Sequence, residues 1–341
     1  MQKVNVVIGA TGIVGSHVLL QLLLSQQKVI ACKQKSSDVS KVKRLFQFYE
    51  NEGDALFETI VWQEIDLRDI FSIEAVVAGA DTVYHCAGLV SFNALDRKQL
   101  MEINVDGTKN IVNACLEKGV KRLCYVSSLA SLHNLDVKEA IDEKVFWKSS
   151  GKESDYAISK YKAELEVWRG MEEGIETVIV NPGVILSPVF WKQSSAKMFH
   201  TCYQGNRFYP PGKTAYVSAW DVASCMLMLM QKECYGERYI LIEGNYTYKE
   251  IFSLIQINFH QKPPNIRVNR LFLRFARVLD TMAAFVSDRD ALITKAIIRS
   301  AFNQQIYSNK KVLKTLDYPF EPTANYIERV CAAYVEQAAK R

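Results

Sequence analysis

The order of hydrophobic and polar positions divides the chain into short apolar runs and longer segments with helical spacing. Runs rich in β-branched residues predict strands at 4–10, 28–33, 59–67, 80–88, 121–128, 176–183 and 237–244. Helical patterns separate them at 15–26, 70–79, 100–119, 154–174 and 220–232. This alternation predicts a parallel sheet with helices on both faces, in which ligands bind beyond the carboxyl ends of the strands.

The pattern loosens after residue 183. Turn signals cluster at 206–217, and from about residue 245 the chain is mostly helical. We therefore predict an α/β fold with a Rossmann-type doubly wound parallel sheet and a smaller, mostly helical substrate-binding cap. The dinucleotide-binding domain is expected at 1–183, with 214–244 returning to it, and the cap at 184–213 and 245–341.

Composition narrows the class of protein. The 341 residues are 49% hydrophobic and 23% charged, which is typical of a soluble globular chain. The net charge of +5 is spread along the sequence, so no nucleic-acid partner is expected. Eight cysteines without C-x-x-C spacing favour a reduced, cytoplasmic setting, and five dispersed histidines give no metal-ligand cluster.

One apolar segment near the C-terminal end bears on membranes. Residues 271–286 are interrupted by Arg274, Arg277 and Asp280, which excludes a spanning helix. We expect an amphipathic helix over a core or substrate cavity and no membrane association, with a membrane-surface helix as the alternative. The N-terminal apolar run ends at a glycine turn and shows no signal-peptide cleavage pattern.

The first strand is followed directly by a glycine loop. Gly9, Gly12 and Gly15 have G-x-x-G-x-x-G spacing between a strand and a helix. Glycines at such positions permit a tight turn and a close approach of backbone to a pyrophosphate, and the helix N-terminus offers N–H donors to phosphate. The loop therefore predicts dinucleotide binding.

This loop resembles that of the short-chain dehydrogenase/reductase superfamily, in its extended, atypical branches. Further similar motifs follow in the same order: "EIDLRD" (64–69), "VYHCAG" (83–88), "INVDGT" (103–108), "VSS" (126–128), "YAISK" (156–160) and "NPGVILSP" (181–188). The "YVSSLAS" segment, the "YPF" near the end and the helical cap look most like the 3β-hydroxysteroid dehydrogenase and dihydroflavonol reductase-like branch.

The resemblance and the loop together assign a set of cofactor-binding residues. They are Gly9, Thr11, Gly12, Ile13, Val14, Gly15, Lys33, Lys35, Asp66, Leu67, Ala87, Gly88, Tyr156, Lys160, Pro182, Gly183 and Val184. An acidic residue at the end of the second strand would select NAD, but none appears there before Asp38. Lys33 and Lys35 suit a 2′-phosphate, so we predict NADP(H), with NAD(H) as the alternative.

Tyr156 and Lys160 are four residues apart in a predicted helix and so share one face. A free tyrosine has a pKa near ~10, and an adjacent ammonium stabilises the phenolate that forms when it gives up a proton. Three serines compete for the third position, Ser127, Ser128 and Ser131. By resemblance the second of the pair, Ser128, is catalytic, and Asn104 is a supporting residue.

These features predict an NADP(H)-dependent reductase of a ketone or aldehyde, or a dehydrogenase of a secondary alcohol. Leu129 and Ala130 stand where sugar-nucleotide dehydratases of the extended family have Asp-Glu, which argues against dehydration. The alternatives are a nucleotide-sugar epimerase with retained cofactor and a non-catalytic NADP(H)-binding sensor. We expect a monomer or homodimer, with a small-molecule substrate pocket that includes Ser91, Phe92, Ser128, His133 and Tyr209.

Overall fold

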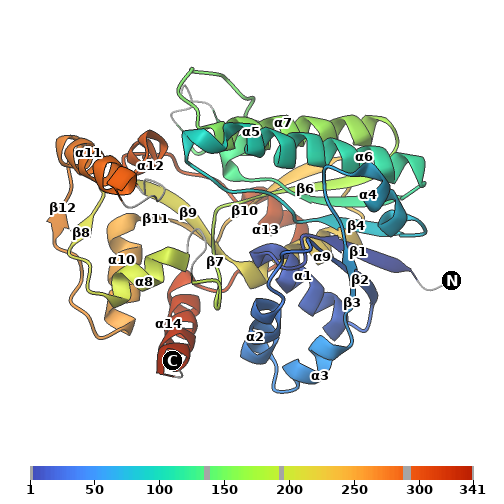
Figure 1. Ribbon diagram of the computed structural model, residues 1–341, viewed down its shortest axis with the longest axis horizontal. Coiled ribbons are helices and arrows are strands. Elements are labelled where there is room, and N and C mark those ends of the chain that lie inside the picture. Colours follow the sequence, from blue (N-terminus) through green and yellow to red (C-terminus); the bar gives the residue numbers. More distant parts are fainter. Residues whose placement is uncertain (1–2, 134–138, 192–195, 287–292, 340–341) are drawn as a thin grey trace.

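In the computed structural model, which describes residues 3–133, 139–191, 196–286 and 293–339, a seven-stranded parallel sheet forms the centre of the molecule (Figure 1). Its strand order is β10-β6-β5-β4-β1-β2-β3, with every neighbouring pair parallel. The strands are β1 (Val4–Ile8), β2 (Lys28–Lys33), β3 (Val61–Glu64), β4 (Thr82–His85), β5 (Arg122–Val126), β6 (Glu176–Pro182) and β10 (Glu237–Leu241). The predicted Rossmann-type fold is confirmed.

Helices cover both faces of this sheet. One face packs against α1 (Ile13–Leu24) and α9 (Ala219–Gln231), and the other against α4 (Ile70–Val77), α6 (Gly107–Glu117) and α7 (Asp155–Glu172). Each face has its own core of apolar side chains, because the buried strands present alternate residues to the two layers. Ser154 caps α7 by accepting a hydrogen bond from the Ala157 backbone N–H.

Some elements differ from the predicted ones. The helix expected at 100–119 is built from α5 (Arg97–Leu100), a π-helical turn η2 (Met101–Asp106) and α6. The helices α2 (Ser40–Tyr49) and α3 (Gly53–Glu58) were not predicted, and η1 (Ala94–Asp96) and η3 (Leu129–Ser131) are short 3₁₀ turns. A π-helical turn inside an α-helix frequently marks a functional position.

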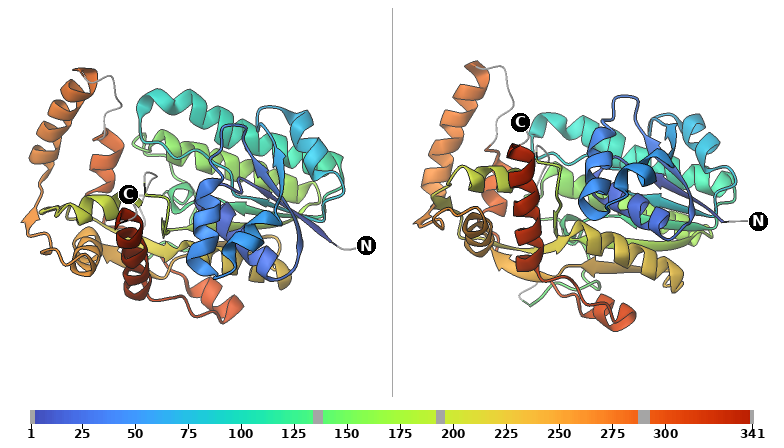
Figure 2. Two further views of the ribbon diagram at one scale, coloured as in Figure 1. Left: turned by 60° about the horizontal axis from the view of Figure 1, so that its bottom comes forward. Right: turned by 90° about the horizontal axis from the view of Figure 1, so that it is seen from below.

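The remaining elements gather at the end of the molecule opposite the N-terminus (Figures 1 and 2). Two small sheets lie there, β11-β9-β7 and β12-β8. Their strands are β7 (Val184–Leu186), β8 (Phe208–Tyr209), β9 (Lys213–Ser218), β11 (Gly244–Thr247) and β12 (Ile266–Arg267). The helices are α8 (Lys197–Tyr203), α10 (Tyr248–Asn258), α11 (Arg270–Val286), α12 (Lys295–Ser300) and α14 (Thr323–Ala339), while α13 (Lys310–Leu316) packs beside β10.

Three hydrogen bonds join the C-terminal segments to the sheet domain. The hydroxyls of Tyr49 and Tyr326, 277 residues apart in sequence, lie 2.8 Å from each other. The buried Asp221 accepts hydrogen bonds from the Tyr318 hydroxyl at 2.7 Å and from the Glu321 backbone N–H at 3.2 Å. These contacts tie α2 and α9 to the last fifty residues of the chain.

All eight cysteines are free thiols, six of them buried and Cys86 and Cys234 half-buried. Burial raises the pKa of the buried thiols, to about 12 for Cys32 and Cys331. No helix among the described residues is long and apolar enough to cross a membrane. The same residues contain no group of three or more histidine, cysteine, aspartate or glutamate side chains arranged to hold a metal ion.

Candidate active site

The glycine loop between β1 and α1 leaves room only for backbone. Gly9 has a φ of +85°, and a Cβ placed on it would lie 2.6 Å from the Ala87 backbone nitrogen. A Cβ on Gly15 would lie 2.2 Å from the Gly9 carbonyl oxygen. The close packing lets α1 begin at Ile13, directly after the loop, where the first backbone N–H groups of the helix have no partner within it and can bind a phosphate. This arrangement fits a dinucleotide.

A cavity of about 630 Å³ lies beside the ends of β2 and β3. Its lining includes Lys35, Asp66 and Leu67, which were predicted to bind the cofactor, and also Ser36 and Arg68. Of the two predicted lysines, Lys35 is exposed at this cavity. The other, Lys33, makes an ion pair with Glu64 at 2.9 Å, so its charge is partly balanced.

Tyr156 and Ser128 meet across the end of the sheet. Ser128 lies two residues after the end of β5, and Tyr156 lies in the first turn of α7, so the two side chains are close to each other. Partial burial raises the pKa of Tyr156, and the nearby Ser128 hydroxyl lowers it. The ring of Phe92 packs edge-on against Tyr156, with 5.7 Å between ring centroids. Tyr156 is therefore a protonated acid at neutral pH, next to a serine hydroxyl.

Lys160 lies one turn further along α7 and is buried. Its Nζ donates to the Val126 carbonyl oxygen at 2.7 Å and to the Tyr125 hydroxyl at 3.0 Å. Burial lowers the pKa of Lys160 to about 8, while the negative charge of Glu164 raises it. A Cβ on Gly88 would be 3.8 Å from this Nζ, which places the end of β4 beside the lysine.

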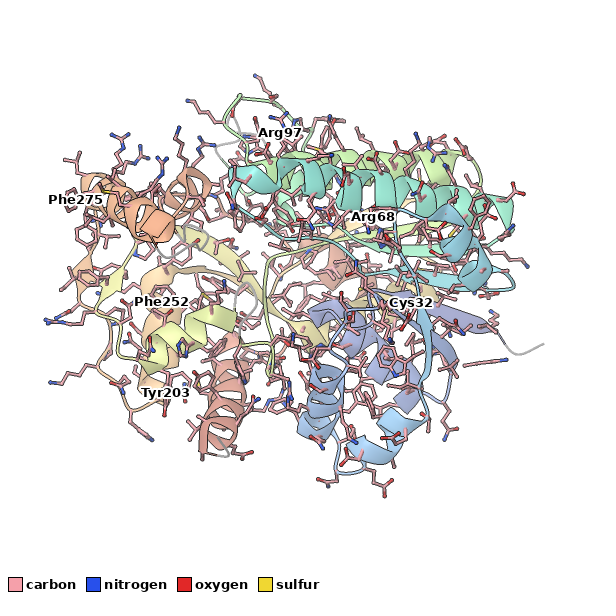
Figure 3. All side chains as sticks on the ribbon, viewed as in Figure 1. Cys32, Arg68, Arg97, Tyr203, Phe252 and Phe275 are labelled. Atoms are coloured by element: carbon pink, nitrogen blue, oxygen red, sulfur yellow. The ribbon has the colours of Figure 1, made fainter. Side chains whose placement is uncertain are left out.

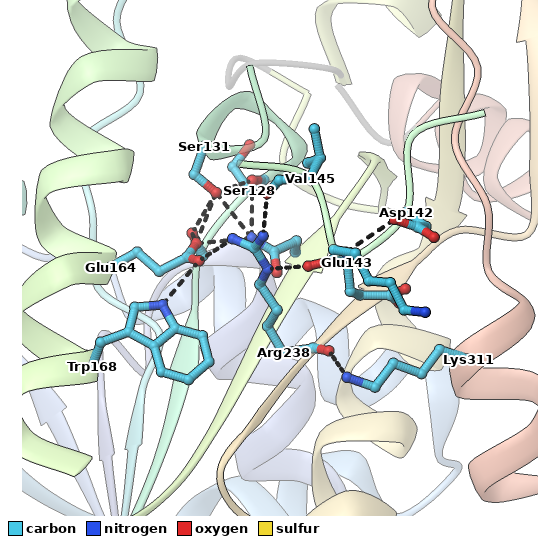
Figure 4. A network of polar contacts seen from close by, with 12 residues as sticks. Ser128, Ser131, Asp142, Glu143, Val145, Glu164, Trp168, Arg238 and Lys311 are labelled. Atoms are coloured by element: carbon cyan, nitrogen blue, oxygen red, sulfur yellow. Dashed lines mark hydrogen bonds and ion pairs between the residues drawn. The ribbon is translucent and has the colours of Figure 1, made fainter. Parts of the chain in front are cut away.

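The structure separates the three competing serines. Ser127 and Ser131 are buried, and their hydroxyls donate to the Glu164 carboxylate at 2.5 Å and 2.7 Å (Figure 4). Asn181 donates to the same oxygen at 2.9 Å. Of the three serines, Ser128 is the one whose side chain acts on the pKa of Tyr156, while the other two are bound to Glu164.

Glu164 was not singled out from the sequence, although it follows Lys160 at a spacing of four residues. Its carboxylate is buried and pairs with the Arg238 guanidinium at 3.1 Å. Arg238 also donates to the backbone carbonyls of Glu143 and Val145, which brings the segment before α7 against β10 (Figure 4). The carbonyl of Ser128 accepts a hydrogen bond from the Asn181 amide at 3.2 Å and lies 2.8 Å from the Ser131 hydroxyl.

Asn104 lies in the π-helical turn and is fully engaged in hydrogen bonds. Its amide donates to the Ser159 hydroxyl at 2.9 Å and to the Leu89 carbonyl at 3.0 Å. Its carbonyl oxygen accepts from the Leu89 N–H at 2.7 Å. The side chain therefore fixes the loop after β4 against α7, the helix that carries Tyr156 and Lys160.

The other predicted residues lie in the loop after β4, beside α7 and in the strands of the cap. Ser91 donates to Asp96 within the loop after β4, next to Phe92. His133 pairs with Glu153 at 3.3 Å, on the side of α7 where Trp147 stacks on Tyr161. Tyr209 lies in β8, with the Lys249 ammonium over its ring. Pro182 ends β6, Val184 begins β7, and Gly183 between them packs on Ala215.

A comparison with known protein families identifies the family to which this chain belongs. Residues 5–241, more than half of the chain, match the NAD dependent epimerase/dehydratase family. The chain belongs to this family. The prediction of an extended short-chain dehydrogenase/reductase is thereby confirmed, and the glycine loop, the strand ends and α7 all lie within the matched residues.

Relatives within the family include named reductases. The chain is 29% identical over 264 residues to "Sterol demethylase protein B" of Methylococcus capsulatus, and 27% identical over 273 residues to "Cinnamoyl-CoA reductase 1" of Arabidopsis thaliana. Both alignments cover 76% of this chain and 76% of the relative. Among solved structures, gox2253 has a TM-score of 0.80 at 26% identity and covers 98% of this chain and 99% of its own.

Proposed function

We propose that this protein is an NADP(H)-dependent reductase of a ketone or aldehyde, acting in reverse as a dehydrogenase of a secondary alcohol. The observation that carries the proposal is the placement of Ser128 beside Tyr156, with Lys160 buried one turn further along the same helix face. Family membership and the named reductases among the relatives support it.

Each member of the trio has a distinct role in this proposal. Ser128 donates a hydrogen bond to the carbonyl oxygen and stabilises the negative charge that develops on it. Tyr156 transfers its hydroxyl proton to that oxygen as the alcohol forms. Lys160 remains an ammonium next to the cleft and stabilises the phenolate left on Tyr156, while holding hydroxyls of the bound nucleotide. Asn104 and Glu164 position these groups.

The dinucleotide, when bound, supplies the hydride for the reduction. The glycine loop and the N-terminus of α1 would hold its pyrophosphate, and Asp66 and Leu67 its adenine. The phosphate-selecting role is assigned to Lys35, because it is exposed at the cavity while Lys33 is paired with Glu64. A kcat/KM for NADH equal to or above that for NADPH would contradict this preference. The eight free thiols support a reducing, cytoplasmic setting.

The test is an NADPH-depletion screen over ketones and aldehydes, with Tyr156→Phe as the diagnostic variant. Removing the hydroxyl keeps the ring that packs on Phe92, so NADPH affinity should change little while kcat falls by about 10²–10⁴. Tyr161→Phe is the matched control, since Tyr161 stacks on Trp147 and lies on another face of the helix. Unchanged turnover by Tyr156→Phe would refute the mechanism.

The same assay separates the two alternatives. An epimerase would retain its dinucleotide through purification and convert substrate without net consumption of NADPH. A sensor would bind NADPH, and neither the wild type nor Tyr156→Phe would oxidise it with any carbonyl compound. The substrate class of the relatives, a sterol or an aromatic thioester by their names, gives the first compounds to include in the screen.

A further inference from the structure

Helix α11 carries its apolar face outward. Leu271, Phe275, Val278 and Met282 follow the spacing of a single helix face, and each is exposed by more than half, from 56% at Val278 to 73% at Leu271. The opposite side faces the protein, because Ala284 is buried and Asp280 accepts a hydrogen bond from the Ile293 N–H at 2.8 Å. The helix thus shows its apolar stripe to the exterior, against the expectation that this stripe covers a core.

The stripe continues onto the neighbouring strands. Phe272 stacks on Phe208 of β8, with ring centroids 5.6 Å apart and planes 22° from parallel. Ile266 of β12 pairs in register with Phe208, and both side chains are exposed. We define the outer face as Phe208, Ile266, Leu271, Phe272, Phe275, Val278, Leu279 and Met282. Other exposed hydrophobic side chains, such as Phe71 and Phe146, stand on separate elements.

The charges at this face are basic. Arg270, Arg274 and Arg277 repeat the spacing of the apolar stripe one residue earlier, so they form an adjacent stripe along α11. Arg267, at the end of β12, is exposed next to Ile266. The one acidic side chain of α11, Asp280, lies on the side that faces the protein. A row of arginines beside a row of leucine and phenylalanine matches an anionic lipid surface.

The shape of the face agrees with this partner. Both views of Figure 2 show α11 as an outermost element of the cap, and Figure 3 shows Phe275 at the outer edge of the molecule. A projecting amphipathic helix can enter the boundary between the headgroups and acyl chains of a bilayer. The absence of a spanning helix among the described residues is compatible with such surface binding.

We propose that the outer face of α11 with β8 and β12 binds an anionic lipid bilayer, with α11 lying parallel to the membrane plane. The arginines contact lipid phosphates, and Leu271, Phe275, Val278 and Met282 enter the upper acyl region. This takes up the membrane-surface alternative raised by the sequence. Helices α11 and α12 pack on each other, and both belong to the cap, to which substrate binding was assigned. A bilayer bound to α11 would therefore lie beside the cap.

The experiment is sedimentation of the full-length protein with vesicles of phosphatidylcholine alone or with about one third phosphatidylglycerol. We expect binding to the anionic vesicles that weakens as salt increases. The variant Phe275→Asp/Met282→Asp should weaken binding at least about tenfold, because two apolar anchors become charged. Arg274→Glu/Arg277→Glu should remove the preference for anionic lipid. Phe71→Asp, which changes an aromatic side chain that is 76% exposed on α4, should bind like the wild type.

Two results would overturn the proposal. One is no binding to either vesicle. The other is that the protein binds no vesicle but forms a concentration-dependent dimer in light scattering, and that Phe275→Asp/Met282→Asp disrupts this dimer. The outer face would then join two copies of the chain. NADPH titration checks that each variant is folded. The measurement needs no turnover, so its outcome is independent of whether the protein reduces carbonyl compounds.

Discussion

Glu164 combines two roles within one carboxylate. It accepts hydrogen bonds from Ser127, Ser131 and Asn181, which fix the backbone of Ser128, and its charge raises the pKa of Lys160. In Glu164→Gln this upward effect is lost, so the pKa of Lys160 should fall below its value of about 8. Reduction needs the ammonium, so the decline of kcat/KM with rising pH should begin at lower pH than in the wild type. At neutral pH a loss of roughly 10–100-fold is expected, the effect of a hydrogen bond to a charged group.

The matched control is Glu166→Gln on the same helix. Glu166 pairs with Arg169 at 3.0 Å at the surface and should leave the pH profile unchanged. A profile of Glu164→Gln that keeps the wild-type shape at reduced height would show that the carboxylate only supports the structure. The assay is kcat/KM for NADPH-dependent reduction over a pH series.

The choice of Ser128 among the three serines remains a prediction made from the sequence. The motif indicated a serine of this segment and a tyrosine four residues before a lysine, and resemblance chose among the serines. The sequence could not predict that Ser127 and Ser131 bind Glu164 and Asn181, because these residues come from different elements. The same holds for Arg238, which pairs with Glu164. The sequence also gave no indication that burial raises the pKa of Tyr156.

At the scale of elements, the turn from β1 into α1 depends on glycine for different reasons at each position. A Cβ on Gly15 would overlap the Gly9 carbonyl at 2.2 Å, whereas a Cβ on Gly12 would lie 3.3 Å from the same oxygen. We expect Gly15→Ala to lower the free energy of unfolding by about 1–3 kcal/mol, the usual cost of overpacking. Urea denaturation measures it, and Gly12→Ala should cost less. Equal losses in the two variants would contradict the steric explanation.

Periodicity predicted the regular strands and helices of the sheet domain but not their local departures. The π-helical turn at Met101–Asp106 has the same helical spacing of apolar residues as the α-helix around it. The sequence therefore gives no sign of this turn, which places Asn104 against Ser159. Helix α2 was not predicted from the pattern of apolar residues. In the structure its Lys43 pairs with Asp54 and Glu58 of α3 at the surface.

At the scale of the whole molecule, the chain crosses between sheet domain and cap several times. Tyr49 meets Tyr326, and Asp221 meets Tyr318. These contacts join residues far apart in sequence and depend on tertiary packing. Composition and periodicity could therefore predict a cap but not which residues connect it to the sheet domain. The amphipathic pattern of 271–286 likewise predicted a helix, and only the structure shows which way its apolar face points.

The buried thiols give this molecule built-in reporters of how its parts open. Cys115 and Cys124 lie within the sheet domain, whereas Cys202 and Cys331 belong to the apolar core of the cap. A thiol reagent reaches each of them only when its surroundings unfold, so labelling rates in the native protein measure local opening. If the cap opens by itself, Cys202 and Cys331 will be labelled first, and mass spectrometry of peptides will show it. Equal rates at all four would mean that cap and sheet domain unfold as one cooperative unit.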